Sequence, residues 1–195
     1  MPKLYLVGIG PGSTELIAPM AVRALENSDI IMGYEKYTEL IEKLVRSRSI
    51  ESGPVTGELE RAKKAIEYVL EGKTVAIISS GDSGIYGMAG IVIEFIAAHH
   101  YDIDIQIVPG ITALNSAGSL LGVPFMNDFC SISLSDRLTE KKDIKKRIQA
   151  RNQAKERILE KLAVYFRCYR SYSNSCYCGI SNNKSILCSS CKYFP

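Results

Sequence analysis

Short apolar segments that end in glycine-rich or serine-rich turns alternate with amphipathic helical patterns over most of the first 134 residues. The first apolar segment, residues 4–7, leads directly into a turn at residues 8–12 with the sequence GIGPG. Strands that alternate with helices in this way favour a mainly parallel sheet covered by helices, so an α/β fold is expected. Ligands of such sheets bind at the carboxyl ends of the strands, and the turns that follow the strands are therefore the candidate site.

The expected elements follow from apolar spacing and from helix-end signals. Pro19 suits a first helical turn, and Gly72 suits the residue after a helix. We expect strands over residues 4–7, 30–32, 74–78, 103–108 and 130–134, and helices over residues 19–27, 37–44, 58–70, 88–98 and 112–121.

Composition and charge narrow the class of partner. A formal net charge of +3 over 195 residues gives no case for a nucleic-acid partner. No apolar run reaches the length of a membrane-spanning helix. The first residues lead into a strand-like segment at residues 3–9 and not into a secretion signal, so a cytoplasmic location is expected.

The turn at residues 8–12 offers glycines at which a ligand can approach the backbone closely. It is not a dinucleotide-binding fingerprint, because the Gly-x-Gly-x-x-Gly pattern needs glycine where Ser13 stands. Pro11 also lacks the amide that could hold a phosphate. Taken alone, the segment is typical of a tight strand-to-helix turn.

Two further turns follow the strands expected at residues 74–78 and 103–108. The first, residues 79–88, reads SSGDSGIYGM, and its Asp82 could accept hydrogen bonds from ligand hydroxyls or amines. An ordinary turn that caps the next helix explains that segment equally well. The second turn ends at Thr112, which is well placed as a helix N-cap, although its hydroxyl could instead face a ligand.

Together, the three turns resemble the tetrapyrrole methylases in their order and spacing. The matching motifs are GIGPG at residues 8–12, GDSGIYG at residues 81–87 and PGITA at residues 109–113, and the resemblance runs from Lys3 to about Thr139. At three segments it narrows to the C17-methyltransferases of precorrin-3B and cobalt-factor III, which couple methylation to ring contraction in cobalamin biosynthesis. These segments are residues 56–62, 84–90 and 127–136.

The resemblance implies an S-adenosylmethionine-dependent methyltransferase with two α/β domains and the cofactor folded between them. The expected cofactor-binding residues are Gly10, Pro11, Gly81, Asp82, Ser83, Tyr86, Met88, Thr112 and Ala113. The expected partners are a tetrapyrrole substrate, precorrin-3B or cobalt-factor III, and a second copy in a homodimer, without a metal cofactor, nucleic acid or membrane.

Asp136 is the candidate catalytic residue, since its carboxylate could orient or deprotonate the substrate. The alternative is a surface carboxylate beside Arg137. Arg137 itself is a candidate for docking the carboxylates of the substrate. Arg61 and Lys64 are expected on solvated helix faces.

The chain departs from the family pattern after Thr139. We expect an N-terminal α/β domain over residues 1–111, the start of a second α/β domain over residues 112–139, and a divergent basic and cysteine-rich tail over residues 140–195. A helix could lie at residues 144–150, but no strand is expected after residue 139. The second domain is therefore expected to be incomplete, and the chain to have little or no C17-methyltransferase activity.

Two alternatives for the function stay open. One is an inactive truncated remnant of the same enzyme, and the other is a methylase of another tetrapyrrole position, against which residues 129–136 argue. The tail also holds two cysteine pairs with spacing that could bind zinc, although an incidental cysteine-rich tail is the simpler interpretation. These cysteines are Cys176, Cys178, Cys188 and Cys191.

Overall fold

The structure is a computed structural model, and it divides the chain into two compact units, Met1–Thr112 and Ala113–Pro195. Each unit is described by itself. The described residues are 2–42, 44–45, 48–123, 125, 129–135, 139–158, 163–166, 178–181 and 184–186, with the backbone alone from residue 151 onward.

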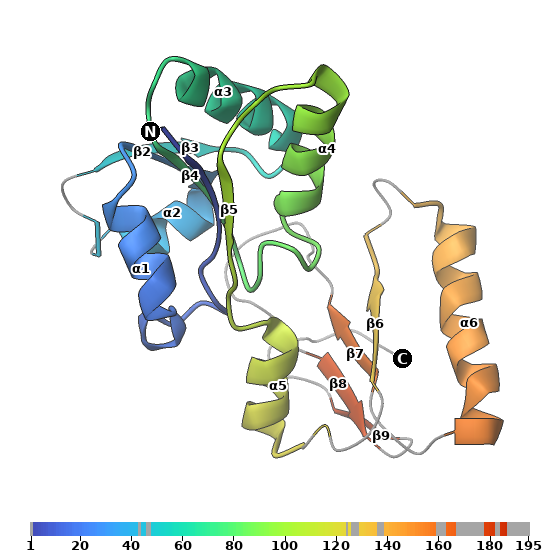
Figure 1. The fold of residues 1–195 in the computed structure, drawn as a ribbon. Coiled ribbons are helices and arrows are strands. Elements are labelled where there is room, and N and C mark those ends of the chain that lie inside the picture. Colours follow the sequence, from blue (N-terminus) through green and yellow to red (C-terminus); the bar gives the residue numbers. More distant parts are fainter. Residues whose placement is uncertain are drawn as a thin grey trace. The chain divides into compact units, whose positions relative to one another are not determined.

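The first unit is built on a five-stranded parallel sheet with the order β3-β2-β4-β1-β5 (Figure 1). Gly8 at the end of β1 pairs with Ser79 at the end of β4, and Val7 pairs with Val108 at the end of β5. These three strands therefore end at one edge of the sheet. The strands are β1 (Leu4–Gly8), β2 (Ile30–Tyr34), β3 (Ser49–Gly53), β4 (Val75–Ser79) and β5 (Ile105–Val108).

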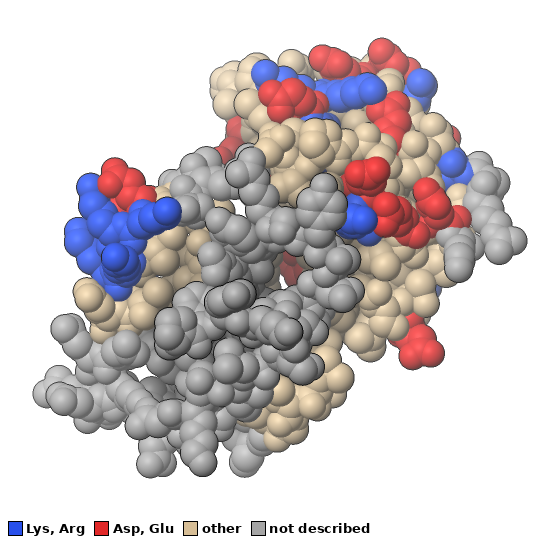
Figure 2. Space-filling model, turned by 180° about the vertical axis from the view of Figure 1, so that it is seen from behind, with Lys and Arg blue, Asp and Glu red and all other residues tan. Residues whose placement is uncertain are grey.

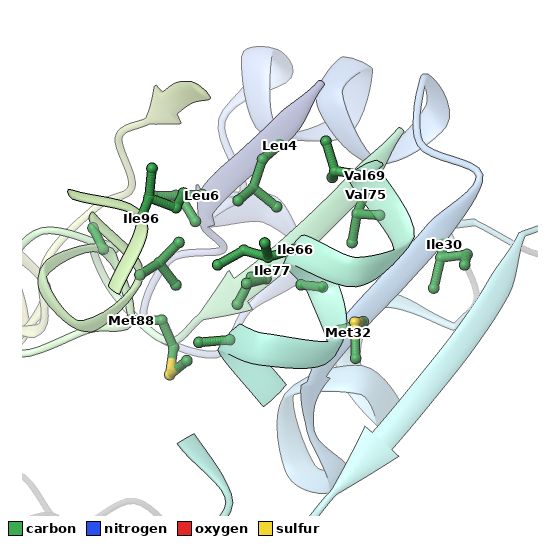
Figure 3. Packing of buried hydrophobic residues seen from close by; sticks show 14 residues of the cluster. Leu4, Leu6, Ile30, Met32, Ile66, Val69, Val75, Ile77, Met88 and Ile96 are labelled. Atoms are coloured by element: carbon green, nitrogen blue, oxygen red, sulfur yellow. The ribbon is translucent and has the colours of Figure 1, made fainter. Parts of the chain in front are cut away.

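Helices cover both faces of this sheet. One core cluster joins the sheet to α3 and α4, and the other joins it to α1 and α2. Successive side chains of a strand point to opposite faces, so Leu4 and Leu6 enter the first cluster while Val7 enters the second. Figure 3 shows Leu4, Leu6 and Ile77 in the first cluster with Ile66 of α3. The helices are α1 (Pro19–Glu26), α2 (Glu35–Ile41), α3 (Glu58–Leu70) and α4 (Ala89–His99), with a short 3-10 helix at Thr14–Leu16.

The edge strand β3 is absent from the sequence-based prediction because its sequence, SIESG, has a single apolar residue. Polar contacts hold it instead. Glu51 forms an ion pair of 2.6 Å with Lys64 and accepts a hydrogen bond of 2.7 Å from the hydroxyl of Tyr68, both on α3. The hydroxyls of Ser52 and Thr38 lie 2.6 Å apart. A polar strand that depends on contacts distant in sequence cannot be recognised from local periodicity.

Arg61 contradicts the expectation of a solvated helix face. Its residue surface is only 8% exposed, and its guanidinium donates a hydrogen bond of 2.8 Å to the carbonyl of Pro54. Burial lowers the pKa of Arg61, partly offset by the charge of Glu58. Arg61 therefore fastens α3 to the segment that leaves β3.

The second unit contains a four-stranded sheet with the order β6-β7-β8-β9. β6 and β7 are parallel, and the two later pairs are antiparallel. The prediction that no strand follows residue 139 is therefore wrong, since pairing with β6 creates strands that tail composition alone does not indicate. The elements are α5 (Ala113–Leu121), β6 (Cys130–Ser133), α6 (Lys141–Ile158), β7 (Ala163–Phe166), β8 (Cys178–Ser181) and β9 (Lys184–Ile186).

Helix α6 has 18 residues and extends well beyond the helix expected at residues 144–150. Ile144 is buried, whereas the neighbouring Lys145 and Lys146 are exposed. Figure 2 shows basic side chains gathered on the surface of the described part of this helix. None of the helices in the described residues has both the length and the apolar character that crossing a membrane requires.

Candidate active site at the carboxyl edge of the first sheet

The turns that follow β1 and β4 are joined through their backbones. Gly10 donates a hydrogen bond of 3.0 Å to the carbonyl of Gly81, and Gly81 donates one of 2.7 Å to the carbonyl of Gly10. The amide of Ile9 donates to the carbonyl of Ser79 at 2.9 Å. An antiparallel bridge therefore links the two turns beyond the ends of the parallel strands β1 and β4.

Asp82 joins the turn after β4 to the turn after β5. Its Oδ2 accepts a hydrogen bond of 2.9 Å from the amide of Gly110, and its Oδ1 accepts one of 2.8 Å from the amide of Gly84. The residue is half-buried. Since hydrogen bonds to an ionised carboxylate are stronger than hydrogen bonds between neutral groups, Asp82 holds the two turns together.

The three turns approach one another so closely that Gly8 and Gly110 leave no room for a side chain. A Cβ on Gly8 would lie 2.6 Å from the carbonyl oxygen of Gly81 and 2.7 Å from the amide nitrogen of Gly110. A Cβ on Gly110 would collide with the same oxygen of Gly81. Sequence analysis did not single out Gly8 and Gly110 as site residues. Glycines that end β1 and follow β5 by two residues are the signal that could have found them.

Ser83 and Met88 lie beneath the edge and not on its surface. The hydroxyl of Ser83 is buried and donates a hydrogen bond of 3.0 Å to the carbonyl of Leu6. Met88 is 6% exposed and packs in the core cluster with α3 and α4 (Figure 3). Its amide donates to the hydroxyl of Ser79 at 3.1 Å. Both residues support the turn from inside, which argues against a direct contact of either side chain with a ligand.

Tyr86 adopts a left-handed backbone conformation with φ of 56°. This region is unfavourable for residues with a Cβ by about 1–2 kcal/mol. The residue is nevertheless 61% exposed, in the same turn as Asp82.

The remaining predicted cofactor residues lie along the turns after β1 and β5. Pro11 is buried, and Gly12, which follows it, is exposed with φ of 124°. A Cβ on Gly12 would have no atom within 4 Å, so the backbone is open to a ligand there. Thr112, half-buried, ends the first unit, and Ala113 begins α5 in the second.

Asp136 and Arg137 lie outside the described residues, as do Cys176, Cys188 and Cys191. Cys178 belongs to β8, where the backbone alone is described. The described residues hold no cluster of three or more His, Cys, Asp or Glu that could bind a metal ion.

Comparisons with known proteins identify relatives of this chain. Residues 3–170 match the family model of the tetrapyrrole (corrin/porphyrin) methylases, which extends past the departure expected at Thr139. Cobalt-factor III methyltransferase of Priestia megaterium is 48% identical over 141 residues, covering 70% of this chain and 26% of that protein. A probable cobalt-factor III C(17)-methyltransferase of Salmonella typhimurium is 45% identical over 136 residues, covering 70% of this chain and 56% of that protein.

The fold agrees as well. The crystal structure of the methyltransferase CobJ superposes with a TM-score of 0.75 at 31% identity, covering 85% of this chain and 68% of that chain. The matched region spans 26% of the length of the Priestia megaterium protein and 56% of the length of the Salmonella typhimurium protein. Since the family model covers most of the chain, this protein belongs to the tetrapyrrole methylase family.

Proposed function

We propose that this chain is an S-adenosylmethionine-dependent C-methyltransferase that methylates C17 of a corrin precursor in cobalamin biosynthesis. The observation that carries the proposal is the edge at which Gly10 pairs with Gly81 and Asp82 accepts from Gly110. The motifs that form this edge are those that resemble the family. The relatives named for cobalt-factor III support that compound, or precorrin-3B, as the substrate.

The described residues fit a cofactor that approaches the backbone closely. Gly12 leaves open space at the rim, and the glycine contacts fix the three turns before any ligand binds. Gly10 and Gly81 bond to each other and would let the cofactor approach the backbone without a side chain in the way, Pro11 and Thr112 are proposed as further contacts, and Asp82 keeps the turns in place. Ala113 is proposed as a further contact from the start of α5.

S-adenosylmethionine supplies a sulfonium methyl group that is already activated for transfer to a ring carbon. The work of the protein is to align the ring carbon with that methyl and to exclude water. Rigid turns serve this purpose, because a displacement of 1 Å in the bound geometry is costly for the rate. Asp136 is proposed to orient or deprotonate the substrate, and Arg137 to dock its carboxylates.

We also propose a homodimer located in the cytoplasm, with no nucleic-acid or membrane partner. The proposal of a homodimer rests on the family resemblance. Light scattering by the purified chain tests it, and a monomer at all concentrations would contradict it.

The second candidate function is an inactive remnant that binds the cofactor without transferring the methyl. The divergent basic and cysteine-rich composition of residues 140–195 favours it. The expected lack of strands after residue 139 does not support the remnant, because β7, β8 and β9 form a sheet with β6.

Transfer of labelled methyl from S-adenosylmethionine to cobalt-factor III distinguishes the two functions. The methyltransferase yields labelled tetrapyrrole over repeated turnovers. The remnant binds S-adenosylhomocysteine but gives no labelled tetrapyrrole above a boiled-protein control.

A further inference from the structure

The two compact units of the chain carry net charges of opposite sign. Residues 1–112 hold 10 Lys and Arg and 15 Asp and Glu, which gives a net charge of −5. Residues 113–195 hold 14 Lys and Arg and 6 Asp and Glu, which gives a net charge of +8. The small net charge of the whole chain therefore combines an acidic unit with a strongly basic one.

Helix α6 is the main source of the positive charge. It holds eight Lys or Arg and two Asp or Glu, a net charge of +6. The buried Ile144 packs one side of the helix against the protein, whereas the basic side chains described in α6 are exposed. Figure 2 shows them gathered together. We call these residues the basic surface of α6: Lys141, Lys142, Lys145, Lys146 and Arg147.

Nearby acidic residues neutralise only part of this surface. Glu140 forms an ion pair of 2.7 Å with Lys142, and Asp143 forms one of 3.4 Å with Lys146. The four side chains are 43–71% exposed, so water screens both pairs and neither is strong. Five basic residues against two acidic ones leave residues 140–147 with a net charge of +3.

The two ligands of the proposed function also differ in the sign of their charge. S-adenosylmethionine has a sulfonium and an ammonium group against one carboxylate, so its net charge is positive. The tetrapyrrole substrate bears many carboxylates and is a polyanion. The first unit, which holds the candidate cofactor edge, has the sign that attracts the cofactor and repels the substrate. A basic surface elsewhere on the chain has the sign that attracts the substrate.

We propose that the basic surface of α6 is a docking surface that attracts the carboxylates of the tetrapyrrole substrate and speeds its binding. This inference rests on the proposed function. Lys and Arg form charge-assisted hydrogen bonds with carboxylates, and a surface of one sign raises the rate at which an oppositely charged ligand arrives by about 10- to 1000-fold. The effect of exposed charges extends about 10 Å at 0.1 M salt and is screened as salt rises, so binding of the substrate depends on salt.

Stopped-flow absorbance of cobalt-factor III mixed with the full chain measures this rate. The variant with both Lys145→Glu and Lys146→Glu changes the charge of residues 140–147 from +3 to −1. Glutamate forms helices about as well as lysine does, so α6 is expected to be kept. At low salt we expect the variant to associate about tenfold more slowly than the natural chain. At 1 M salt, where screening reduces the range to about 3 Å, the two rates should converge.

The variant with both Arg23→Glu and Lys36→Glu is the matched control. These two residues are exposed on α1 and α2 of the first unit, and replacing them changes the total charge of the chain by the same amount. We expect this control to slow association by less than about twofold, because its charges lie outside the basic surface. S-adenosylhomocysteine, which has no net charge, should bind equally to both variants and to the natural chain in calorimetric titration.

Three results would overturn the proposal. The first is association of the α6 variant at the natural rate in low salt, as expected of a helix whose charges serve only solvation. The second is a slowing that persists at 1 M salt, which would assign the effect to altered structure. The third is an equal slowing in the control, which would assign it to total charge.

A short single-stranded RNA is the probe for a competing occupant of the same surface. Binding of this RNA that is lost in the α6 variant, while cobalt-factor III associates with that variant at the natural rate, would assign the surface to nucleic acid and overturn the proposal. RNA that does not bind the natural chain supports it.

The failure of this proposal is distinguishable from the failure of the proposed function. A natural chain that binds neither S-adenosylhomocysteine nor cobalt-factor III contradicts the proposed function and, with it, the role of α6. A natural chain that binds both, with the α6 variant associating at the same rate, contradicts the role of α6 alone.

Discussion

The backbone amide of Gly110 donates a hydrogen bond of 2.9 Å to Oδ2 of Asp82, and this bond joins the turns after β4 and β5. The other carboxylate oxygen accepts from Gly84. From the sequence, Asp82 is a candidate acceptor for ligand hydroxyls or amines. In the structure, its oxygens hold the site together, so its contribution to cofactor binding is expected to act largely through the position of the turns.

Replacing Asp82 by Asn tests this role. The asparagine amide nitrogen cannot accept the second backbone hydrogen bond, and the charge is lost. We expect the free energy of unfolding to fall by about 1.5–3 kcal/mol, the range for hydrogen bonds to charged groups, and S-adenosylhomocysteine binding to weaken. Asp102→Asn, at an exposed loop position before β5, is the control and should change neither quantity. Normal binding and stability in Asp82→Asn would contradict the role given to the carboxylate.

Gly8→Ala is expected to separate the three turns. The added Cβ would meet backbone atoms of both other turns at 2.6 to 2.9 Å, and backbone cannot move aside as a flexible side chain can. We expect a loss of stability of about 1–3 kcal/mol and loss of cofactor binding, measured by chemical unfolding and calorimetry.

Gly90→Ala is the matched control for this substitution. Gly90 lies in α4, and a Cβ there would have no atom within 4 Å. Since alanine favours helices more than glycine does, this variant should be more stable by about 0.5–1 kcal/mol and bind normally. Equal effects of the two substitutions would refute the close approach at Gly8.

We expect substitution of Ser83 to change mainly the stability of the chain, and substitution of Thr112 to change mainly its binding of S-adenosylhomocysteine. Ser83→Ala removes the buried hydrogen bond to Leu6 and should cost about 1 kcal/mol of stability with little change in binding. Thr112→Val should weaken S-adenosylhomocysteine binding more than it lowers stability, if its hydroxyl contacts the cofactor. Titration of both variants beside their unfolding curves tests this contrast. Equal binding by Thr112→Val and the natural chain would remove Thr112 from the site.

Glu51 makes the attachment of β3 dependent on pH. Burial raises the pKa of Glu51, but hydrogen bonds from Lys64 and Tyr68 and the charges of Lys64 and Lys73 outweigh it, so the net pKa is lowered. A lowered pKa in the folded state gives stability that is present above the ordinary glutamate value of about 4.3 and is lost as pH falls through the folded value.

The pair is partly exposed, so we expect a contribution below about 1 kcal/mol. Glu51→Gln should therefore reduce stability at pH 7 and leave it unchanged at low pH, where the natural carboxyl is protonated. Unfolding curves measured at pH 7 and at low pH check this expectation. A deficit that is the same size at low pH would show that the charge of Glu51 is not the cause.

The first sheet was largely predictable because its strands are short apolar runs that the helices bury on both faces. β1, β2 and β4 fall on such runs and β5 on a partly buried one, whereas β3 depends on Glu51 and Tyr68, which are 17 residues apart in the sequence. The motifs also predicted which turns follow the strands at the carboxyl edge of this sheet. What they could not show is how Asp82, Ser83 and Met88 are used, because this depends on which backbone groups each residue meets in the fold.

The later strands could not be predicted for a related reason. β7, β8 and β9 lie in a tail rich in Tyr, Ser, Cys and Asn with no clear period, and they become strands through pairing with β6 and with one another. Such pairing is a property of the folded unit and leaves little trace in local sequence.

Calorimetric titration of the purified chain with S-adenosylhomocysteine tests the central claim most directly, since the claim is that the carboxyl edge of the first sheet, where Gly10 pairs with Gly81, holds the cofactor. The account predicts saturable binding by the natural chain and by Gly90→Ala, weaker binding by Asp82→Asn, and none by Gly8→Ala. Absence of binding by the folded natural chain, or undiminished binding by a folded Gly8→Ala variant, would contradict it.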